Sequence, residues 1–289
     1  MSAPEQAAPA QTILGCSTAA ERGSRAGRLL PVLLQPLYRL YERRLLAAVC
    51  AGLMPRHIGI ILDGNRRHAR KLGITDPRTV YGIGAQKLDD VLDWCVEIDI
   101  PTVTLWVFSP ENLRRPGEEV SGILAAVEAK LTALAQDARI HDRRVRVRAI
   151  GKRSLVPPSV RTAIQAAEAA TAEYEGMVLN IAVGYGGRQE ITDAVTALLE
   201  DSLRAELSLA ETIAALSPVA IGRYLYTAGL PDPDLIIRTS GEVRLSGFML
   251  WQSAHSEFYF TDVHWPAFRK IDFLRAIRSY QSRQRRFGT

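Results

Sequence analysis

Short apolar runs alternate with amphipathic segments along most of this chain. The runs at 57–62, 102–108 and 177–183 are rich in β-branched residues and short enough to be buried strands. Shorter or more mixed runs predict further strands at 145–150, 235–237 and 248–252. The continuous apolar character of the first three runs indicates a sheet that is covered on both faces.

Apolar residues at helical spacing follow most of these runs. Leu88, Val91, Leu92 and Cys95 share one face of a predicted helix at 87–98. The same spacing predicts helices at 121–134, 159–174, 191–199 and 272–286, and a helix with a basic start follows residue 64. This β-α-β-α order predicts one α/β domain with a largely parallel sheet flanked by helices.

The beginning of the chain differs from the remainder. Residues 1–28 are rich in Ala, Ser, Gly and Pro without periodicity, which predicts a disordered tail. Within residues 29–53, apolar residues recur at helical spacing with arginines on the other faces, which predicts an amphipathic helix. This helix either docks on its own domain or contacts a membrane surface. Residues 54–289 form the predicted catalytic domain.

Composition and charge narrow the classes of function. The 289 residues are 47% hydrophobic, which is enough for a sizeable core. A net charge of +5 and a pI of about 9.2 suit an anionic ligand, an acidic lipid surface or nucleic acid. Nucleic acid is the least favoured of these, because no aromatic residues are interleaved with a basic stripe.

The cysteines and the apolar runs bear on where the protein resides. Cys16, Cys50 and Cys95 are widely separated and form no metal-ligand spacing, which indicates a reduced, cytoplasmic setting. The sequence contains no run of about 20 apolar residues, so no transmembrane helix is expected. Association with the inner face of a membrane would depend on the N-terminal helix.

Four predicted strands end in segments that share glycines, arginines and amides. Ligands of open α/β sheets bind at the carboxyl ends of the strands. The segments are DGNRR (63–67), SPENLRR (109–115), GYGGRQE (184–190) and RTSGEVRLSG (238–247). Glycines allow close backbone approach and arginines bind phosphate oxygens in pairs, so these ends indicate more than one phosphate group. The chain has no P-loop motif GxxxxGK[ST].

Asp63 has two interpretations. An aspartate between an apolar strand and a helix is often the N-cap of that helix. A lone carboxylate among phosphate-binding cations also suits Mg²⁺, which prefers one or two carboxylates together with phosphate oxygens and water. Glu257 is a candidate for the second carboxylate. Because no serine has a nearby histidine in a known arrangement, the expected chemistry is electrostatic stabilisation of a departing diphosphate.

These segments resemble the cis-prenyltransferases, the Z-isoprenyl diphosphate synthases related to undecaprenyl diphosphate synthase. The similarity spans 54–289 and is carried by HIGIILDGNRRHAR, FSPENLRRP, NIAVGYGGRQEI, PDPDLIIRTSGEVRLSGFMLWQSAHSEFYFTDVHWPAF and RRFG. The resemblance implies a six-stranded parallel sheet, helices around an apolar tunnel, and a homodimer. It also implies a Mg²⁺-dependent transferase that condenses isopentenyl diphosphate with dimethylallyl, geranyl or farnesyl diphosphate to form a Z (cis) prenyl diphosphate.

The resemblance also assigns roles to single residues. Asp63 and Glu257 match the residues that hold Mg²⁺, Asp63 also assisting diphosphate departure, and Asn112 matches an asparagine that assists proton removal. The residues that match substrate-binding positions are Gly64, Asn65, Arg66, Arg67, His68, Arg78, Ser109, Glu111, Arg115, Arg238, Arg244, Ser246, Arg286 and Gly288. Among them, Arg238, Arg244 and Ser246 match the isopentenyl diphosphate site.

Departures from the common family pattern bear on the product. Arg66 and His68 stand where many relatives have glycine and tryptophan, and Gly247 stands where many have asparagine. The LYRLYERRL entry helix, Gly247 and the NLRRP variant resemble the actinobacterial short-chain branch, which makes Z-farnesyl diphosphate. Val107 matches a position where a bulky side chain narrows the tunnel. We therefore expect a short product, with a decaprenyl or undecaprenyl product as the alternative. A non-catalytic subunit of the same fold is disfavoured, because such relatives lose the aspartate and arginines found here.

Overall fold

The computed structural model describes residues 35–283, and its contacts divide the chain into two compact units after Arg44. Of the first unit, the described residues comprise only the start of α2 (Gln35–Cys50). The predicted tail at 1–28 lies outside the described residues, and α2 lies within the helix predicted at 29–53. None of the helices in the described part of the chain is long and apolar enough to cross a lipid bilayer.

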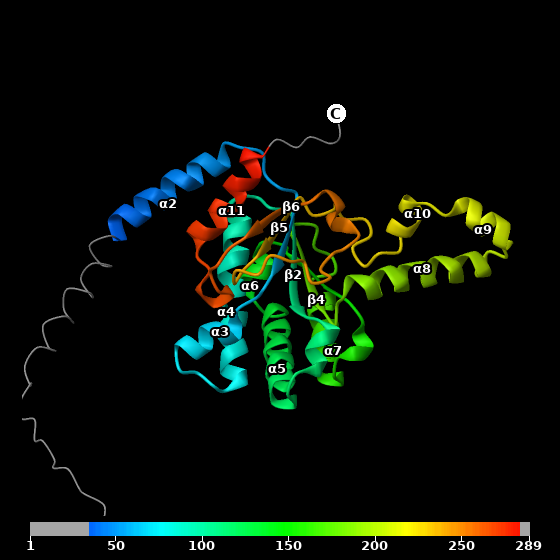
Figure 1. The fold of residues 1–289 in the computed structure, drawn as a ribbon, viewed down its shortest axis with the longest axis horizontal. Helices are drawn as coiled ribbons and strands as arrows, with labels where there is room; N and C mark the ends of the chain where they lie inside the picture. The colour runs from blue at the N-terminus through cyan, green and yellow to red at the C-terminus, as the bar shows by residue number, and fades with distance from the viewer. Residues whose placement is uncertain (1–34, 284–289) are drawn as a thin grey trace, which may run out of the picture. The chain divides into compact units, whose positions relative to one another are not determined.

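Six parallel strands form one sheet in the second unit, Leu45–Thr289 (Figure 1). Their order across the sheet is β3 (Arg146–Ile150), β4 (Val178–Val183), β2 (Thr102–Phe108), β1 (His57–Ile61), β5 (Leu235–Arg238) and β6 (Glu257–Phe260). The first five match predicted strands to within one residue at each end. The α/β class and the six-stranded parallel sheet are therefore confirmed.

The strand predicted at 248–252 is wrong. Residues 248–251 lie in turns, Gln252 begins the 3₁₀ helix η3 (Gln252–His255), and the sixth strand is β6, which follows them. The backbone of Ser246, Gly247 and Met249 is left-handed, with φ of 52°, 94° and 46°. A left-handed residue reverses the chain direction, so the apolar run there cannot extend into a strand.

Helices cover the sheet and continue beyond it. They are α3 (Asn65–Lys71), α4 (Pro77–Glu97), α5 (Gly117–Leu134), α6 (Ala138–Asp142), α7 (Pro158–Ala170), α8 (Gly187–Arg204), α9 (Leu209–Ala215), α10 (Pro218–Gly222) and α11 (Lys270–Ser282). Helix α4 packs beside α5, and α5 beside α7. Helices α8 to α10 project away from the sheet as an arm, drawn in yellow-green in Figure 1.

Local contacts explain two helix ends that the periodicity misplaced. Helix α4 begins ten residues before the predicted start, because the Asp76 carboxylate caps it by accepting from Thr79 N at 2.8 Å. Helix α7 ends at Ala170 rather than at residue 174. The buried Thr171 hydroxyl donates to Ala167 O and accepts from Val147 N of β3 at 3.0 Å, so the chain turns toward the sheet there.

A buried histidine links the first strands of the sheet. His57 is fully buried at the start of β1, and its Nδ1 lies 2.7 Å from Pro231 O. A carbonyl only accepts, so Nδ1 carries the proton and Nε2 accepts from the Thr104 hydroxyl at 2.8 Å. The Thr104 oxygen in turn accepts from Asn180 Nδ2 at 3.0 Å. The neutral ring therefore completes a chain of hydrogen bonds across β1, β2 and β4.

The free energy of unfolding should fall by about 3 kcal/mol from pH 6.5 to pH 4 because of His57 alone. Burial lowers the pKa of His57 from 6.5 to about 4, although the hydrogen bond to Pro231 and the charge of Asp234 raise it. In this window the unfolded chain binds a proton that the folded chain excludes, so stability is lost as the pH falls. Denaturant unfolding at several pH values measures the slope, and the His57→Gln variant should lack this component. The same slope in that variant would contradict the assignment.

Candidate active site

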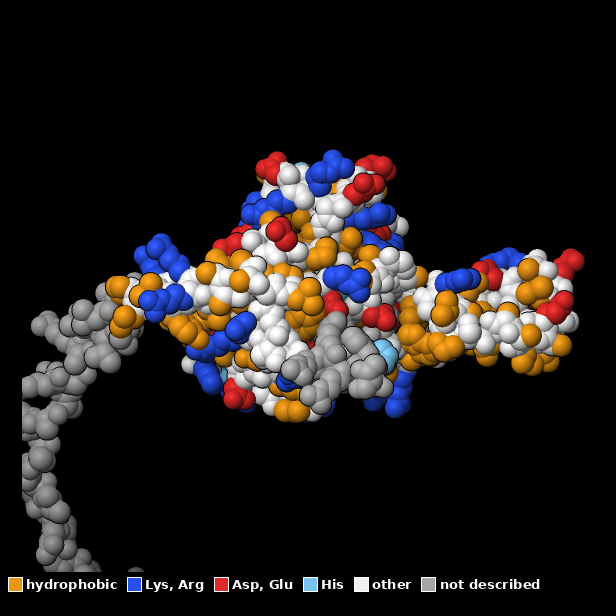
Figure 2. Space-filling model, turned by 90° about the horizontal axis from the view of Figure 1, so that it is seen from above, with side chains coloured by type: hydrophobic (Ala, Val, Ile, Leu, Met, Phe, Trp, Pro, Cys, Tyr) orange, Lys and Arg blue, Asp and Glu red, His pale blue; other side chains and the backbone are white. Residues whose placement is uncertain are grey.

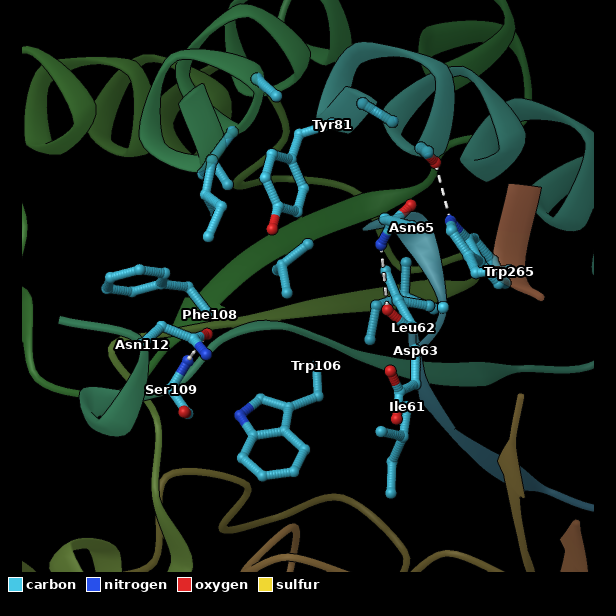
Figure 3. Close-up of a pocket in the computed structure, with 18 of the residues that line it drawn as sticks. Ile61, Leu62, Asp63, Asn65, Tyr81, Trp106, Phe108, Ser109, Asn112 and Trp265 are labelled. Carbon is cyan, nitrogen blue, oxygen red and sulfur yellow. Dashed lines mark hydrogen bonds between the residues drawn. The ribbon is translucent and has the colours of Figure 1, made fainter. Parts of the chain in front are cut away.

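A cavity of about 650 Å³ opens at the carboxyl ends of β1, β2 and β5 and runs between α4 and α5. Figure 3 shows Asp63 on one side of this cavity, Ser109 and Asn112 on the other, and Trp106 between them. Its mouth is lined by six arginines and two carboxylates: Arg66, Arg67, Arg70, Arg115, Arg238, Arg244, Asp63 and Glu242. Its deeper part is mainly apolar and includes Ala85, Leu88, Leu105, Ile123, Val127, Leu131 and Ile181.

An ion pair at the mouth joins the ends of two neighbouring strands. Arg238 is the last residue of β5 and pairs in register with Ile61, which places its side chain beside Asp63. Arg238 Nη2 donates to Asp63 Oδ2 at 2.9 Å. The arginine side chain is 6% exposed and the carboxylate 30% exposed. A buried guanidinium needs a counter-charge, so this contact holds Asp63 with one edge toward the cavity.

Arg238 also shapes the loop that follows β5, residues 239–251. Its Nη1 donates to Ser246 Oγ at 2.9 Å and to the carbonyl of Arg244. Five residues of this loop have left-handed backbone: Ser240, Gly241, Ser246, Gly247 and Met249. Such conformations are uncommon outside glycine and persist where surrounding contacts impose them, often at binding sites. The loop therefore presents Arg244 and Ser246 to the cavity in one imposed shape.

A buried network anchors the far end of this loop. The Tyr185 hydroxyl donates to Glu190 Oε2 at 2.5 Å and accepts from Met249 N at 3.1 Å. Gln252 Nε2 donates to Glu190 Oε1 at 2.9 Å. Burial raises the pKa of Glu190, although these hydrogen bonds lower it. The GYGGRQE segment thus anchors the loop after β5, and none of its residues lines the cavity.

Gly64, and not Asp63, is the N-cap of α3. Gly64 has a φ of 103°, and a Cβ there would meet Ser240 and His264 at 3.0 Å. The N-cap interpretation of Asp63 is therefore wrong, because its carboxylate binds Arg238 instead of the helix start.

A second glycine makes room for the Asn65 amide. Asn65 Nδ2 donates to Leu62 O at 3.2 Å, and a Cβ on Gly84 of α4 would overlap Asn65 Oδ1. The carbonyl of Gly84 accepts from Trp265 Nε1 at 2.7 Å. Asn65 Oδ1 is buried and has no hydrogen-bond partner among the described residues. The Asn65 amide is thus positioned by its close packing against Gly84 as well as by its hydrogen bond to Leu62.

Glu119 gathers groups from three elements at the top of the tunnel. Its Oε1 accepts from the Tyr81 hydroxyl at 2.7 Å and from Arg115 Nη1 at 2.8 Å, and its Oε2 lies 3.4 Å from Arg66 Nη1. Burial and the hydrogen bond to Glu119 raise the pKa of Tyr81 to about 12. Burial raises the pKa of Glu119, but the bonds from Tyr81 and Arg115 outweigh it, so that pKa is lowered. Arg66 therefore has a partner in Glu119.

Asn112 fixes the loop after β2. Its Oδ1 accepts from Ser109 N at 2.9 Å in the first turn of the short 3₁₀ helix η1 (Pro110–Arg114). Because Oδ1 is engaged by the backbone, the NH₂ group is the part of this amide that is left to meet a ligand.

Most of the predicted site residues meet at this cavity. Those that line it are Asp63, Gly64, Asn65, Arg66, Arg67, Ser109, Asn112, Arg115, Arg238, Arg244 and Ser246. The structure does not place His68, Arg78 or Glu111 in the lining; His68 instead meets His264 edge to face. Arg286 and Gly288 lie outside the described residues.

Glu257 is not brought to Asp63. It begins β6, in register with Leu235, whereas Arg238 beside Asp63 lies at the other end of β5. Three residues of strand separate the two positions, or about 10 Å along the sheet. The Glu257 carboxylate pairs instead with Arg283.

Several lining residues carried no signal that the sequence analysis used. Tyr81, Trp106 and Trp265 line the cavity but lie outside the four strand-end segments that the sequence singled out. Arg70 could have been found, since it lies on the same face of α3 as Arg66 and Arg67. Trp265 could not, because it reaches the cavity through a contact with Gly84, far away in sequence.

The side chains at the cavity mouth suit a magnesium ion that takes one ligand from the protein and most of its other ligands from a bound phosphate group. No cluster of three or more His, Cys, Asp or Glu side chains suited to a metal occurs among residues 35–283. Asp63 Oδ1 faces the cavity with only a 3.6 Å contact to Arg67. One free carboxylate edge beside a cationic mouth suits Mg²⁺, which completes its shell with phosphate oxygens and water.

An α/β protein with a cationic mouth above an apolar tunnel is built to hold a ligand with an anionic head and an apolar tail. Residues 61–288 match the profile of a family described as "Putative undecaprenyl diphosphate synthase". An isoprenyl transferase of Thermus thermophilus is 57% identical over 261 residues, which cover 90% of this chain and 99% of that protein. The (2Z,6E)-farnesyl diphosphate synthase of Thermobifida fusca is 51% identical over 253 residues, covering 88% and 97%.

A solved structure shares the fold. The crystal structure of lavandulyl diphosphate synthase from Lavandula x intermedia in complex with dimethylallyl diphosphate superimposes with a TM-score of 0.74 at 31% identity. The match covers 82% of this chain and 99% of that one. This chain belongs to the undecaprenyl diphosphate synthase family, the cis-prenyltransferases.

Gly84→Ala should weaken the binding of inorganic diphosphate by about 10-fold, because the new methyl group displaces the Asn65 amide at the cavity mouth. Titration calorimetry measures the affinity. Gly82→Ala is the matched control on the same helix, where a Cβ meets nothing within 4 Å. The control should bind normally and be slightly more stable. Equal affinities for the two variants would show that Asn65 does not depend on Gly84.

Proposed function

We propose that this protein is a Mg²⁺-dependent cis-prenyltransferase that condenses isopentenyl diphosphate with an allylic diphosphate and releases a short Z-prenyl diphosphate, about the length of Z-farnesyl diphosphate. The main support for this proposal is that one cavity combines a charged mouth with an apolar tunnel. Six arginines and two carboxylates line the mouth, and the tunnel lies between α4 and α5. This arrangement matches an anionic head with a hydrocarbon tail.

The reaction requires charge stabilisation more than proton transfer. The allylic carbon–oxygen bond breaks, and the diphosphate leaves with the electron pair. The double bond of isopentenyl diphosphate attacks the allylic carbon, and the released diphosphate accepts the proton lost from the carbon next to the resulting cation. Arg66 and Arg67 would hold the departing diphosphate, while Arg244 and Ser246 would hold the second substrate. Bound Mg²⁺ would neutralise diphosphate charge, with Asp63 as its protein ligand.

The length of the tunnel supports a short product. The Tyr81–Glu119 hydrogen bond marks its top, and Lys130 and Leu131 are the last α5 residues in its lining. From Glu119 to Lys130 the helix rises about 16 Å at 1.5 Å per residue. An extended chain advances about 1.2 Å per backbone bond, so three four-bond isoprenoid units span about 14 Å. A decaprenyl or undecaprenyl chain, the alternative, would be several times longer than this tunnel. The names of relatives do not choose between the two lengths, because an undecaprenyl diphosphate synthase of Methanopyrus kandleri and the Thermobifida enzyme are both 51% identical to this chain.

We also propose a homodimer that forms through the projecting arm. Leu203 of α8, with Leu209 and Ile213 of α9, are 78%, 74% and 63% exposed. Figure 2 shows hydrophobic side chains gathered on this arm. A contiguous apolar surface of this kind is typical of an interface, and a second copy of the chain offers a self-complementary partner. Light scattering should give a mass twice that of the 31.9 kDa chain.

Product analysis tests the proposed function directly. The protein is incubated with isopentenyl diphosphate, Mg²⁺ and in turn dimethylallyl, geranyl, farnesyl or geranylgeranyl diphosphate, and the products are separated by reversed-phase chromatography. Elongation of a primer to a Z product of farnesyl length is expected, and chelation of the metal should abolish it. A failure to elongate any primer would overturn the enzyme proposal, and a main product of 50 to 55 carbons would overturn the short-chain part.

Asp63→Asn should lower kcat by at least about 100-fold and also lower the unfolding temperature, because the buried Arg238 loses its counter-charge. The asparagine amide oxygen still accepts the hydrogen bond from Arg238, but the charge that would bind the metal is lost. Steady-state kinetics over a range of Mg²⁺ concentrations measures the loss, and thermal unfolding reports on the fold. A variant with near-normal kcat would contradict the metal role of Asp63.

Val107→Leu should shorten the products by narrowing the tunnel. Val107 lies on β2 and lines the cavity, so one added methylene group occupies space next to the growing chain. Val178→Leu is the matched control, a partly buried strand valine outside the lining. Product profiles from one primer should differ between the two variants. An unchanged profile for Val107→Leu would remove this residue from the length-setting surface.

A further inference from the structure

One basic side chain interrupts the apolar deep half of the tunnel. Among the described residues that line this half, the neighbours of Lys130 are apolar: Ala85, Leu88, Ala126, Val127 and Leu131. Lys130 lies near the end of α5, one helical turn beyond Val127 and Ala126, at the bottom of the lining. A cation is an unfavourable neighbour for hydrocarbon, so its presence there requires a reason.

The Lys130 ammonium is held by a carboxylate from the opposite wall. Its Nζ lies 2.6 Å from Oδ1 of Asp89, which follows the lining residue Leu88 on α4. The two side chains are 14% and 28% exposed. Arg139 of the α6 helix donates to the same Asp89 oxygen at 3.1 Å. The ion pair thus connects α4 and α5, and Arg139 of α6 forms a further hydrogen bond to its carboxylate.

The pair separates the tunnel from the space behind it. Asp89 lines a second cavity of about 10 Å³ with Asp93, Arg139 and Arg143, whereas Lys130 lines the tunnel. These four charged side chains around the small space are 28% to 46% exposed, so a hydrocarbon chain that passed the pair would meet charge and water instead of an apolar wall. Tyr81–Glu119 at the top and Lys130–Asp89 at the bottom therefore join the same two helices at the two ends of the tunnel.

We propose that the Lys130–Asp89 ion pair is the floor of the tunnel and that Lys130 is a specificity-determining residue, which ends elongation when the chain end reaches it. This inference rests on the proposed prenyltransferase function. A chain that grows further would have to push the ammonium off its carboxylate and press hydrocarbon against two charges. Release of the shorter product is then the easier course.

Substitutions that remove the charge, the volume or the partner test the floor separately. Lys130→Met keeps most of the side-chain length without the charge, Lys130→Ala removes both, and Asp89→Asn removes the partner charge. Lys87→Met is the matched control, because Lys87 also lies in an ion pair on α4, with Asp90 at 2.7 Å, but does not line the tunnel. Each protein receives the same allylic primer with excess isopentenyl diphosphate, and the products are separated by chain length.

We expect Lys130→Met, Lys130→Ala and Asp89→Asn to shift the main product by at least one isopentenyl unit toward longer chains, while Lys87→Met keeps the wild-type profile. Wild-type profiles from both Lys130 variants, with normal turnover, would overturn the proposal. Longer products from Lys130→Ala alone would also overturn it, because volume and not the ion pair would then set the length. Thermal unfolding identifies any variant that fails to fold, in which case the other two decide.

The wild-type reaction separates this inference from the proposed function. If the wild-type protein elongates no primer, the prenyltransferase proposal is wrong, and the proposal that the Lys130–Asp89 ion pair limits product length is wrong as well. If the wild-type protein elongates a primer and the charge-removing variants release the same products, only the floor fails.

Discussion

The ion pair between Asp63 and Arg238 is the contact on which the rest of the site depends. It joins the ends of β1 and β5, two strands brought together only by the sheet, and leaves one edge of the Asp63 carboxylate toward the cavity. The same guanidinium holds Ser246 and the Arg244 carbonyl, so the loop after β5 takes its shape from it. A charge buried this deeply is tolerated only when it is paired and hydrogen-bonded. That requirement fixes Asp63, Arg244 and Ser246 relative to one another.

The cavity combines two environments because its walls come from different kinds of element. Loops at the carboxyl ends of the strands supply the arginines, and the facing sides of α4 and α5 supply the apolar lining. In the proposed function, electrostatic attraction would hold a diphosphate at the mouth, and burial of apolar surface would draw its tail into the tunnel. The two contacts between α4 and α5, Tyr81–Glu119 and Lys130–Asp89, then limit the length of the hydrocarbon tail that fits between them.

The pattern of apolar residues predicted five strands correctly but did not predict the conformation of the loops. Five strands were predicted to within one residue, because burial on both faces leaves a continuous apolar run. The run at 248–252 looked equally apolar, yet left-handed backbone at Met249 and its neighbours makes it a turn that covers the core. Hydrophobicity reports burial but carries no information about backbone handedness. The glycines of the GYGGRQE segment suggested a phosphate-binding strand end. In the structure, Tyr185 and Glu190 of this segment hold the loop after β5 through a buried network.

The sequence by itself determined the α/β class, the parallel sheet and the cationic character of the three strand ends that line the cavity, because residue type and spacing suffice for each. Only the tertiary structure decided which of those residues meet. It made Asp63 a partner of Arg238 instead of a helix cap, gave Arg66 a partner in Glu119, and placed Glu257 away from Asp63. It also placed Lys130 at the bottom of the tunnel against Asp89. Such pairings depend on strand order, register and helix packing, which are properties of the folded chain and not of any local segment.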